Sequence, residues 1–346
     1  MIAKSKIDLS SISEEELLKL RIKNLPLNID GTWLSDCVGE LYQELEAKGI
    51  KFKPICYLSD EWFTPDQDPQ ISIPFFLAHP ALIKLEKKMM REAEGETKPW
   101  CMQLLRHEAG HAINYAYKLY QTPDWKKIFG QFSKEYGDTY RFRPYSKSFV
   151  RHLEKFYAQC HPDEDFAETF AVWLAPGFDW HTHYRGWKAQ EKLQYVDRVI
   201  QEIKDKPPLV KKGKKYRKAS SLSLTLTNYY KNKKRTFAED FPDFHDSNLI
   251  KIFSDKHKDD TRPPYAYSII KKYKDNISDE VSIWTGEKKF IINDLLETMI
   301  ARCKHLGLLN PMPEQEAVLK ISVYVTALTM NYVHTGRFLR KKWKRS

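Results

Sequence analysis

The stretch "LLRHEAGHAINYAYKLY", Leu104 to Tyr120, carries residue types at a spacing that suits metal chemistry. His107 and His111 are four residues apart, and residues i and i+4 of a helix lie one above the other, so both imidazoles project from one face. Glu108 lies about 100° further round the helix, beside a shared metal ion rather than on it. There its carboxylate could take a proton from a water molecule. The spacing therefore predicts half of a zinc site built for hydrolysis, with Glu108 as general base.

A second stretch, "AQCHPDEDFAETFAVWLAPG", offers a third ligand. Glu164 and Glu168 are four residues apart and share a helix face. Glu164 also suits the positive end of the helix dipole, as any acid in a first turn does. Glu168 comes after the first turn and is flanked by Ala167 and Phe170, where a carboxylate is costly unless it is paired or bound to metal. From the residues alone, either glutamate could complete the site.

Histidines are the other candidates for the third ligand. His161 directly precedes the acidic helix, and His181 and His183 form the string "WHTH". A site with three histidines would resemble the SprT or metzincin arrangement. The metzincin spacing HExxHxxGxxH is absent, because "AINYAY" follows His111.

The string "HEAGH" followed by a helix with a glutamate ligand resembles the gluzincin class of zinc peptidases. The string "PDEDFAETFA" is similar to the second motif of anthrax lethal factor and related small gluzincins. With "LSDEWF", "IPFFLAHP" and "RPYS", these motifs resemble a bacterial family of zinc-binding metallopeptidases over about residues 20–204. The resemblance implies a zincin-like domain that binds one Zn²⁺ ion per chain.

The same resemblance assigns roles to single residues. His107, His111 and Glu164 become the metal ligands, and Glu168 is expected to orient His107 through its other ring nitrogen. Tyr157, seven residues before Glu164, occupies the place of a tyrosine that helps to stabilise the oxyanion. The resemblance also implies that an edge strand, Ile71–Leu77, holds an extended peptide substrate.

The coarse pattern of elements indicates an α+β fold. Short strands are predicted in Ile50–Asp60 and Gln70–Pro80, and Pro74 makes the second an edge strand. We expect a short antiparallel or mixed sheet and an active-site helix over about Pro99–Leu119. Further helices are predicted over Ser13–Lys23, Thr32–Lys48, Leu82–Ala93, Pro162–Leu174, Gly186–Lys204, Asn293–Leu308 and Pro313–Trp343, and from near Ser148 onward.

Charge is divided unevenly along the 346 residues. Residues 1–204 hold 28 Lys+Arg against 30 Asp+Glu, a net charge of −2, whereas residues 205–346 hold the other 29 against 16, a net charge of +13. The stretch "DKPPLVKKGKKYRKASS", residues 205–221, contains seven basic residues together with Pro-Pro and Gly, as a solvated linker would. We therefore predict a metallopeptidase domain over 1–204, a basic linker over 205–221 and a helical basic domain over 222–346.

Cysteine usage and hydropathy indicate a cytoplasmic protein. The five cysteines are odd in number and include no CxxC pair, which is typical of a reducing compartment. No run of 18 apolar residues is present, so we expect no membrane-spanning helix. The N-terminal residues lack the apolar segment of a signal peptide.

Three functional hypotheses follow. The first is a zinc metallopeptidase that hydrolyses a peptide or amide bond of a peptide or protein substrate. The second is a non-catalytic zinc protein that binds a partner. The third is a SprT-like, DNA-associated protease, in which residues 205–346 bind nucleic acid or another anionic partner through Lys and Arg interleaved with Tyr.

Overall fold

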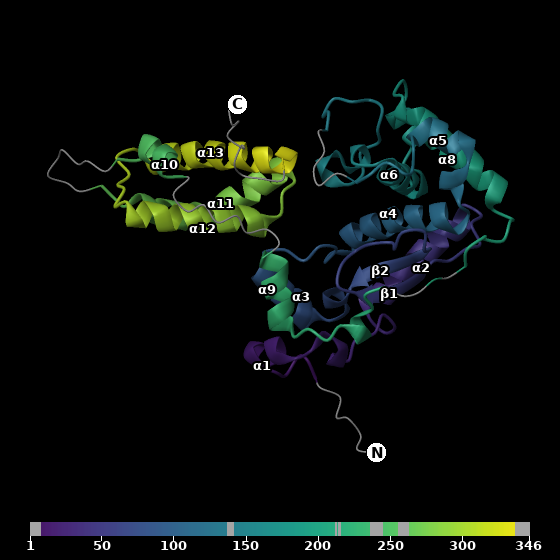
Figure 1. Ribbon diagram of the computed structural model, residues 1–346, viewed down its shortest axis with the longest axis horizontal. Helices are drawn as coiled ribbons and strands as arrows, with labels where there is room; N and C mark the ends of the chain where they lie inside the picture. The colour runs from purple at the N-terminus through teal and green to yellow at the C-terminus, as the bar shows by residue number, and fades with distance from the viewer. Residues whose placement is uncertain are drawn as a thin grey trace, which may run out of the picture. The chain divides into compact units, whose positions relative to one another are not determined.

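A computed structural model of the chain describes residues 8–136, 142–211, 213, 216–235, 245–254 and 263–335. The chain divides into two compact units (Figure 1). Unit 1 contains residues 1–89, 93–137 and 141–232, and unit 2 contains residues 90–92, 138–140 and 233–346. The fold is α+β, as predicted, because many helices accompany one small sheet.

Unit 1 holds the sheet and the two helices predicted to bind metal. Its strands are β1 (Ile55–Ser59) and β2 (Gln70–Pro74). Its helices are α1 (Glu14–Lys19), α2 (Trp33–Ala47), α3 (Pro80–Met90), α4 (Lys98–Ala116), α5 (Pro123–Phe129), α6 (Pro162–Leu174), α7 (Trp180–His183), α8 (Ala189–Ile203) and α9 (Leu226–Arg235). Short 3-10 helices cover Ile22–Asn24, Phe75–Ala78, Leu119–Gln121, Glu154–Gln159 and Ala219–Ser221. The helix predicted from near Ser148 is thus only the 3-10 turn Glu154–Gln159.

Local capping explains where several helices begin. Ser13 and Glu16 form the capping box expected at the start of α1, and the Thr32 side chain caps α2. At the start of α6, the ring of His161 accepts a hydrogen bond from the N–H of Asp163. Pro162 takes the first position of α6, where its missing N–H leaves no helical bond unmade.

The two strands pair in parallel, so the predicted antiparallel or mixed sheet is wrong. Antiparallel strands that follow each other in sequence are commonly joined by a short hairpin loop. Here the connecting loop 60–69 runs back along β2 instead, and Phe63 forms an isolated bridge with Ser72. The chain therefore enters β2 in the direction in which it left β1.

Close packing of α4 on α6 forms the framework of the candidate site (Figure 1). A Cβ atom at Gly110 would lie 2.7 Å from the Cα and 2.9 Å from the carbonyl oxygen of Ala167. Only glycine permits this approach, which explains why a residue with poor helix propensity lies in the middle of α4. Every residue of α6 is buried.

The segment predicted as a linker packs on unit 1 instead. Tyr216 accepts a hydrogen bond through its carbonyl oxygen from the Tyr57 hydroxyl, and Arg217 forms an ion pair with Asp60. The N–H groups of Leu209 and Val210 both donate to the carbonyl oxygen of Ala116. Unit 1 therefore extends to residue 232, beyond the predicted boundaries at 204 and 221. Scattered apolar and aromatic residues anchor this basic segment.

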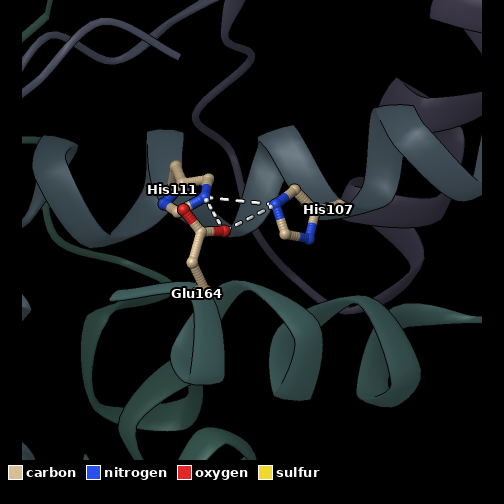
Figure 2. Close-up of side chains that lie close together, drawn as sticks. All are labelled: His107, His111 and Glu164. Atoms are coloured by element: carbon tan, nitrogen blue, oxygen red, sulfur yellow. Dashed lines mark hydrogen bonds and ion pairs between the residues drawn. The ribbon is translucent and has the colours of Figure 1, made fainter. Parts of the chain in front are cut away.

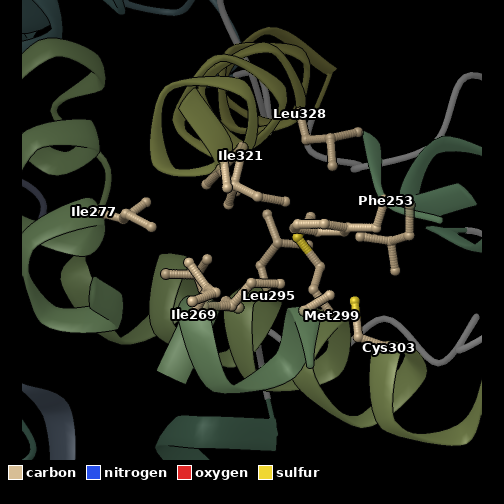
Figure 3. Close-up of a cluster of buried hydrophobic side chains, with 14 of the residues drawn as sticks. Phe253, Ile269, Ile277, Leu295, Met299, Cys303, Ile321 and Leu328 are labelled. Carbon is tan, nitrogen blue, oxygen red and sulfur yellow. The ribbon is translucent and has the colours of Figure 1, made fainter. Parts of the chain in front are cut away.

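Unit 2 is helical, as predicted for the C-terminal part. It contains α10 (Asp246–Ile252), α11 (Ala266–Thr285), α12 (Lys289–His305) and α13 (Glu314–Thr335). All four helices contribute side chains to one apolar core, α10 through Leu249. Figure 3 shows Ile269, Leu295 and Ile321 meeting there. The predicted helix 313–343 is described only to residue 335, and its basic end lies outside the described residues.

Among the described helices, none has the length and apolar character needed to cross a membrane. All five cysteines are free thiols.

Candidate metal centre

Three side chains from α4 and α6 point their donor atoms at one another (Figure 2). Glu164 Oε2 lies 3.1 Å from His107 Nε2 and 3.2 Å from His111 Nε2, and the two Nε2 atoms are 3.2 Å apart. The three residues are only 3–6% exposed. His107 and His111 thus share one face of α4, as their i, i+4 spacing predicts, and this face meets the first turn of α6 at Glu164.

Each histidine has a carboxylate behind its ring. Glu168 Oε1 accepts a hydrogen bond from His107 Nδ1 at 2.8 Å, and its other oxygen accepts one from the N–H of Leu153 at 2.8 Å. Asp163 Oδ2 lies 2.9 Å from His111 Nδ1, at an angle outside hydrogen-bond geometry. A carboxylate at Nδ1 favours a proton on that nitrogen, so Nε2 is the nitrogen left to bind a metal.

Asp163 is itself held in place. It accepts hydrogen bonds from Asn114 Nδ2 at 2.7 Å and from the Tyr115 hydroxyl, and both residues follow His111 on α4. The carboxylate is 1% exposed. Its orientation is therefore fixed by the packing of α4 on α6.

Glu108 projects from α4 beside the triad and has its own partner. The Thr64 hydroxyl, from loop 60–69, donates to Glu108 Oε2 at 2.8 Å. Burial raises the pKa of Glu108, and the nearby His107 and His111 oppose that rise. A carboxylate with a raised pKa is a better proton acceptor at neutral pH.

In the triad, the attraction between buried acids and bases shifts the pKa values of all three side chains against the effect of burial. Burial alone would lower the pKa of His107, but hydrogen bonds to Glu164 and Glu168 outweigh it and raise that pKa to about 10. The pKa of His111 also lies well above its usual range, because Asp163 and Glu164 outweigh burial. Burial alone would raise the pKa of Glu164, but the two histidines hold it below its usual range.

The donor set fits a zinc ion. Two imidazole nitrogens and one carboxylate oxygen are the His₂Glu set of catalytic zinc sites, which leave a further position open. Their donor atoms already lie close together, and a carboxylate lies against each Nδ1, as in known zinc sites. The carboxylates also compensate the charge of a buried cation.

The other predicted residues fall in different places. The ring of Tyr157 lies 5.8 Å from that of His107, centroid to centroid. His161 has both ring nitrogens engaged, with the N–H of Asp163 and with the carbonyl oxygen of Lys134, so it has no nitrogen left for a metal. His181 and His183 lie on α7 against Trp180, Phe178 and Tyr184, and neither belongs to the metal-binding group found among the described residues.

The sequence interpretation missed three partners of the site: Asp163, Thr64 and Tyr136. Asp163 lies in the first turn of α6, where the helix dipole alone accounts for an acid. Thr64 and Tyr136 lie 44 and 28 residues from the side chains that they contact, in segments without a motif. Only the position of Asp163, two residues after His161 and one before Glu164, gave a local signal.

The predicted substrate edge on β2 is already occupied. The N–H of Ser72 donates to the carbonyl oxygen of Phe63 at 2.9 Å, and that of Gln70 to Asp68 at 2.8 Å. Pro74, the next residue facing outward on this edge, has no N–H. An added peptide strand would therefore find no backbone donor there, which corrects the expectation of an open edge.

Comparison with known proteins adds no relative. No family model matches the chain, and no curated protein or solved structure matches it. The resemblance to gluzincins therefore rests on the motifs themselves.

Proposed function

We propose that the chain is a zinc-dependent metallopeptidase that hydrolyses a peptide or amide bond, with His107, His111 and Glu164 as metal ligands. The observation that carries the proposal is the convergence of three buried donor atoms within 3.1–3.2 Å of one another, beside a glutamate with a raised pKa. Among the described residues, this is the one group of three or more His, Cys, Asp or Glu side chains able to hold a metal ion.

A zinc ion bound here would supply Lewis acidity, which polarises a carbonyl group and lowers the pKa of water to about 7. Glu108 is the base in this proposal. Thr64 occupies Oε2, so Oε1 is the oxygen that accepts a proton from the attacking water and passes it to the leaving amine. Tyr157, whose ring lies beside that of His107, is the proposed donor to the oxyanion.

Three protein ligands favour catalysis over a purely structural zinc site, since structural sites use four. Glu108→Gln separates the two uses, because glutamine keeps the size of the side chain but accepts no proton. We expect this variant to bind one zinc per chain and to lose hydrolysis of a peptide library, assayed by mass spectrometry. Equal cleavage by wild type and variant would refute the role of Glu108. No zinc in folded wild-type protein would refute the metal centre itself.

The proposed anionic partner of the basic C-terminal part is a separate matter. In unit 2 many basic side chains already pair with local acids, for example Lys272 with Glu314 at 2.7 Å and Arg302 with Asp246 at 2.6 Å. Such pairing reduces the charge available to phosphates. Binding of the full chain to DNA should weaken steeply with added salt if the SprT-like hypothesis holds, and no binding at low salt would exclude it.

A further inference from the structure

Glu164 differs from the two histidines in what supports it. The histidines are backed by buried carboxylates of α6, whereas Glu164 turns its second oxygen toward the loop that precedes residue 137. There the hydroxyl of Tyr136 lies 3.1 Å from Glu164 Oε1. The ordinary pKa of a phenol is about 10, so at neutral pH the hydroxyl carries its proton and donates it to the carboxylate.

The ring of Tyr136 is held independently of Glu164. It stacks on the imidazole of His161, with 3.8 Å between ring centroids and 14° between ring planes. His161 is fixed in turn by the carbonyl oxygen of Lys134 at 2.6 Å and the N–H of Asp163 at 3.1 Å. The phenol is therefore positioned by the start of α6, one turn from the carboxylate that it contacts.

We infer that Tyr136 is a positioning residue, which holds Glu164 so that Oε2 alone faces the two histidines. This inference rests on the proposed metal centre and completes its support, because each of the three ligands then has its own partner. Removing the hydroxyl frees Oε1 to rotate toward the centre and leaves Oε2 less well aligned. Loss of such a partner typically weakens metal binding by about 10–100-fold.

The test compares Tyr136→Phe with wild type, because phenylalanine keeps the stack on His161 and removes only the hydroxyl. Tyr145→Phe is the matched control, since Tyr145 is 93% exposed. Zinc affinity is measured by competition with a chelator, and thermal melting of the metal-free protein is measured beside it. We expect the zinc dissociation constant of Tyr136→Phe to rise about 10–100-fold. Its metal-free melting temperature should stay near that of wild type, since Tyr136 is 52% exposed.

Substitution of cobalt for zinc gives a second readout that a merely structural role would not change. If Tyr136→Phe lets both oxygens of Glu164 bind, the coordination number increases and the visible bands of cobalt weaken. Unchanged zinc affinity and cobalt bands in Tyr136→Phe, with binding still abolished by Glu164→Ala, would refute the role of Tyr136 alone. Zinc binding that survives Glu164→Ala, or that is absent from wild type, would refute the metal centre instead.

Discussion

The packing of α4 on α6 can be tested at Gly110. A Cβ atom there would lie 2.7 Å from Ala167 Cα, whereas carbon atoms in contact are about 3.5–4.0 Å apart. The two helices must then separate locally by about 0.8 Å or more, the shortfall from that contact distance. Overpacking of this kind costs about 1–3 kcal/mol, and it opposes a helix-propensity gain of about 1 kcal/mol for replacing glycine by alanine.

Gly39 provides the matched control. It also lies inside a helix, α2, but an added Cβ would meet nothing within 4 Å. We expect Gly39→Ala to stabilise the protein by about 1 kcal/mol. Because both variants gain the same propensity, the difference between their free energies of unfolding isolates the overpacking cost, about 1–3 kcal/mol.

Zinc affinity gives the second half of this test. Metal–ligand distances stay within about 0.2 Å of their usual values. Separating α4 from α6 should therefore weaken zinc binding in Gly110→Ala. Gly39→Ala should bind zinc as wild type does. Urea unfolding of the metal-free proteins and chelator competition measure the two effects. If Gly110→Ala equals Gly39→Ala in both stability and zinc affinity, then α4 and α6 do not touch at this point.

Three further predictions concern charge and protons. Glu168→Gln should weaken zinc binding about 10–100-fold, because an amide cannot accept from both His107 Nδ1 and the N–H of Leu153; unchanged affinity by chelator competition would contradict this. Zinc binding at pH 7 should release protons, seen by calorimetry in buffers of different ionisation enthalpy, since the raised pKa values of His107 and His111 keep both protonated without metal. In unit 2, burial lowers the pKa of His245 to about 4, so the unfolded chain protonates first as pH falls from 6.5. The free energy of unfolding should then decrease as the pH falls from 6.5 to about 4, and the decrease should be smaller in His245→Gln. Hydrogen exchange of the α12 amides measures both decreases.

Prediction from the sequence succeeded where the residues of a single helix determine the feature, such as a shared face or the position of a helix end. The spacing of His107 and His111 fixes a shared face whatever the rest of the chain does. The acidic helix was found at its observed bounds, Pro162–Leu174, because Pro162 starts it and "APG" ends it. The close approach of Ala167 to Gly110, by contrast, is seen only in the structure.

Prediction failed where a structure depends on contacts between distant segments. The direction of β2 is set by the path of loop 60–69, which no periodicity reveals. Residues 205–221 have the composition of a linker, yet Tyr216 and Arg217 find partners on β1 and the residue that follows it. Likewise, nothing in a single sequence links Tyr136 to Glu164.

The way in which the proposed ligands are supported indicates that the packing of α6 is enough to bring their partners into place. Glu168 and Asp163, which orient the histidines, are 0% and 1% exposed and lie on a helix that is buried throughout. Their positions follow from the packing of α6, every residue of which is buried. A zinc finger differs, since its ligands come together only with the metal. Only the glutamate ligand is supported by a half-exposed side chain, Tyr136, so the precision of the third ligand depends on the stack that holds this ring on His161.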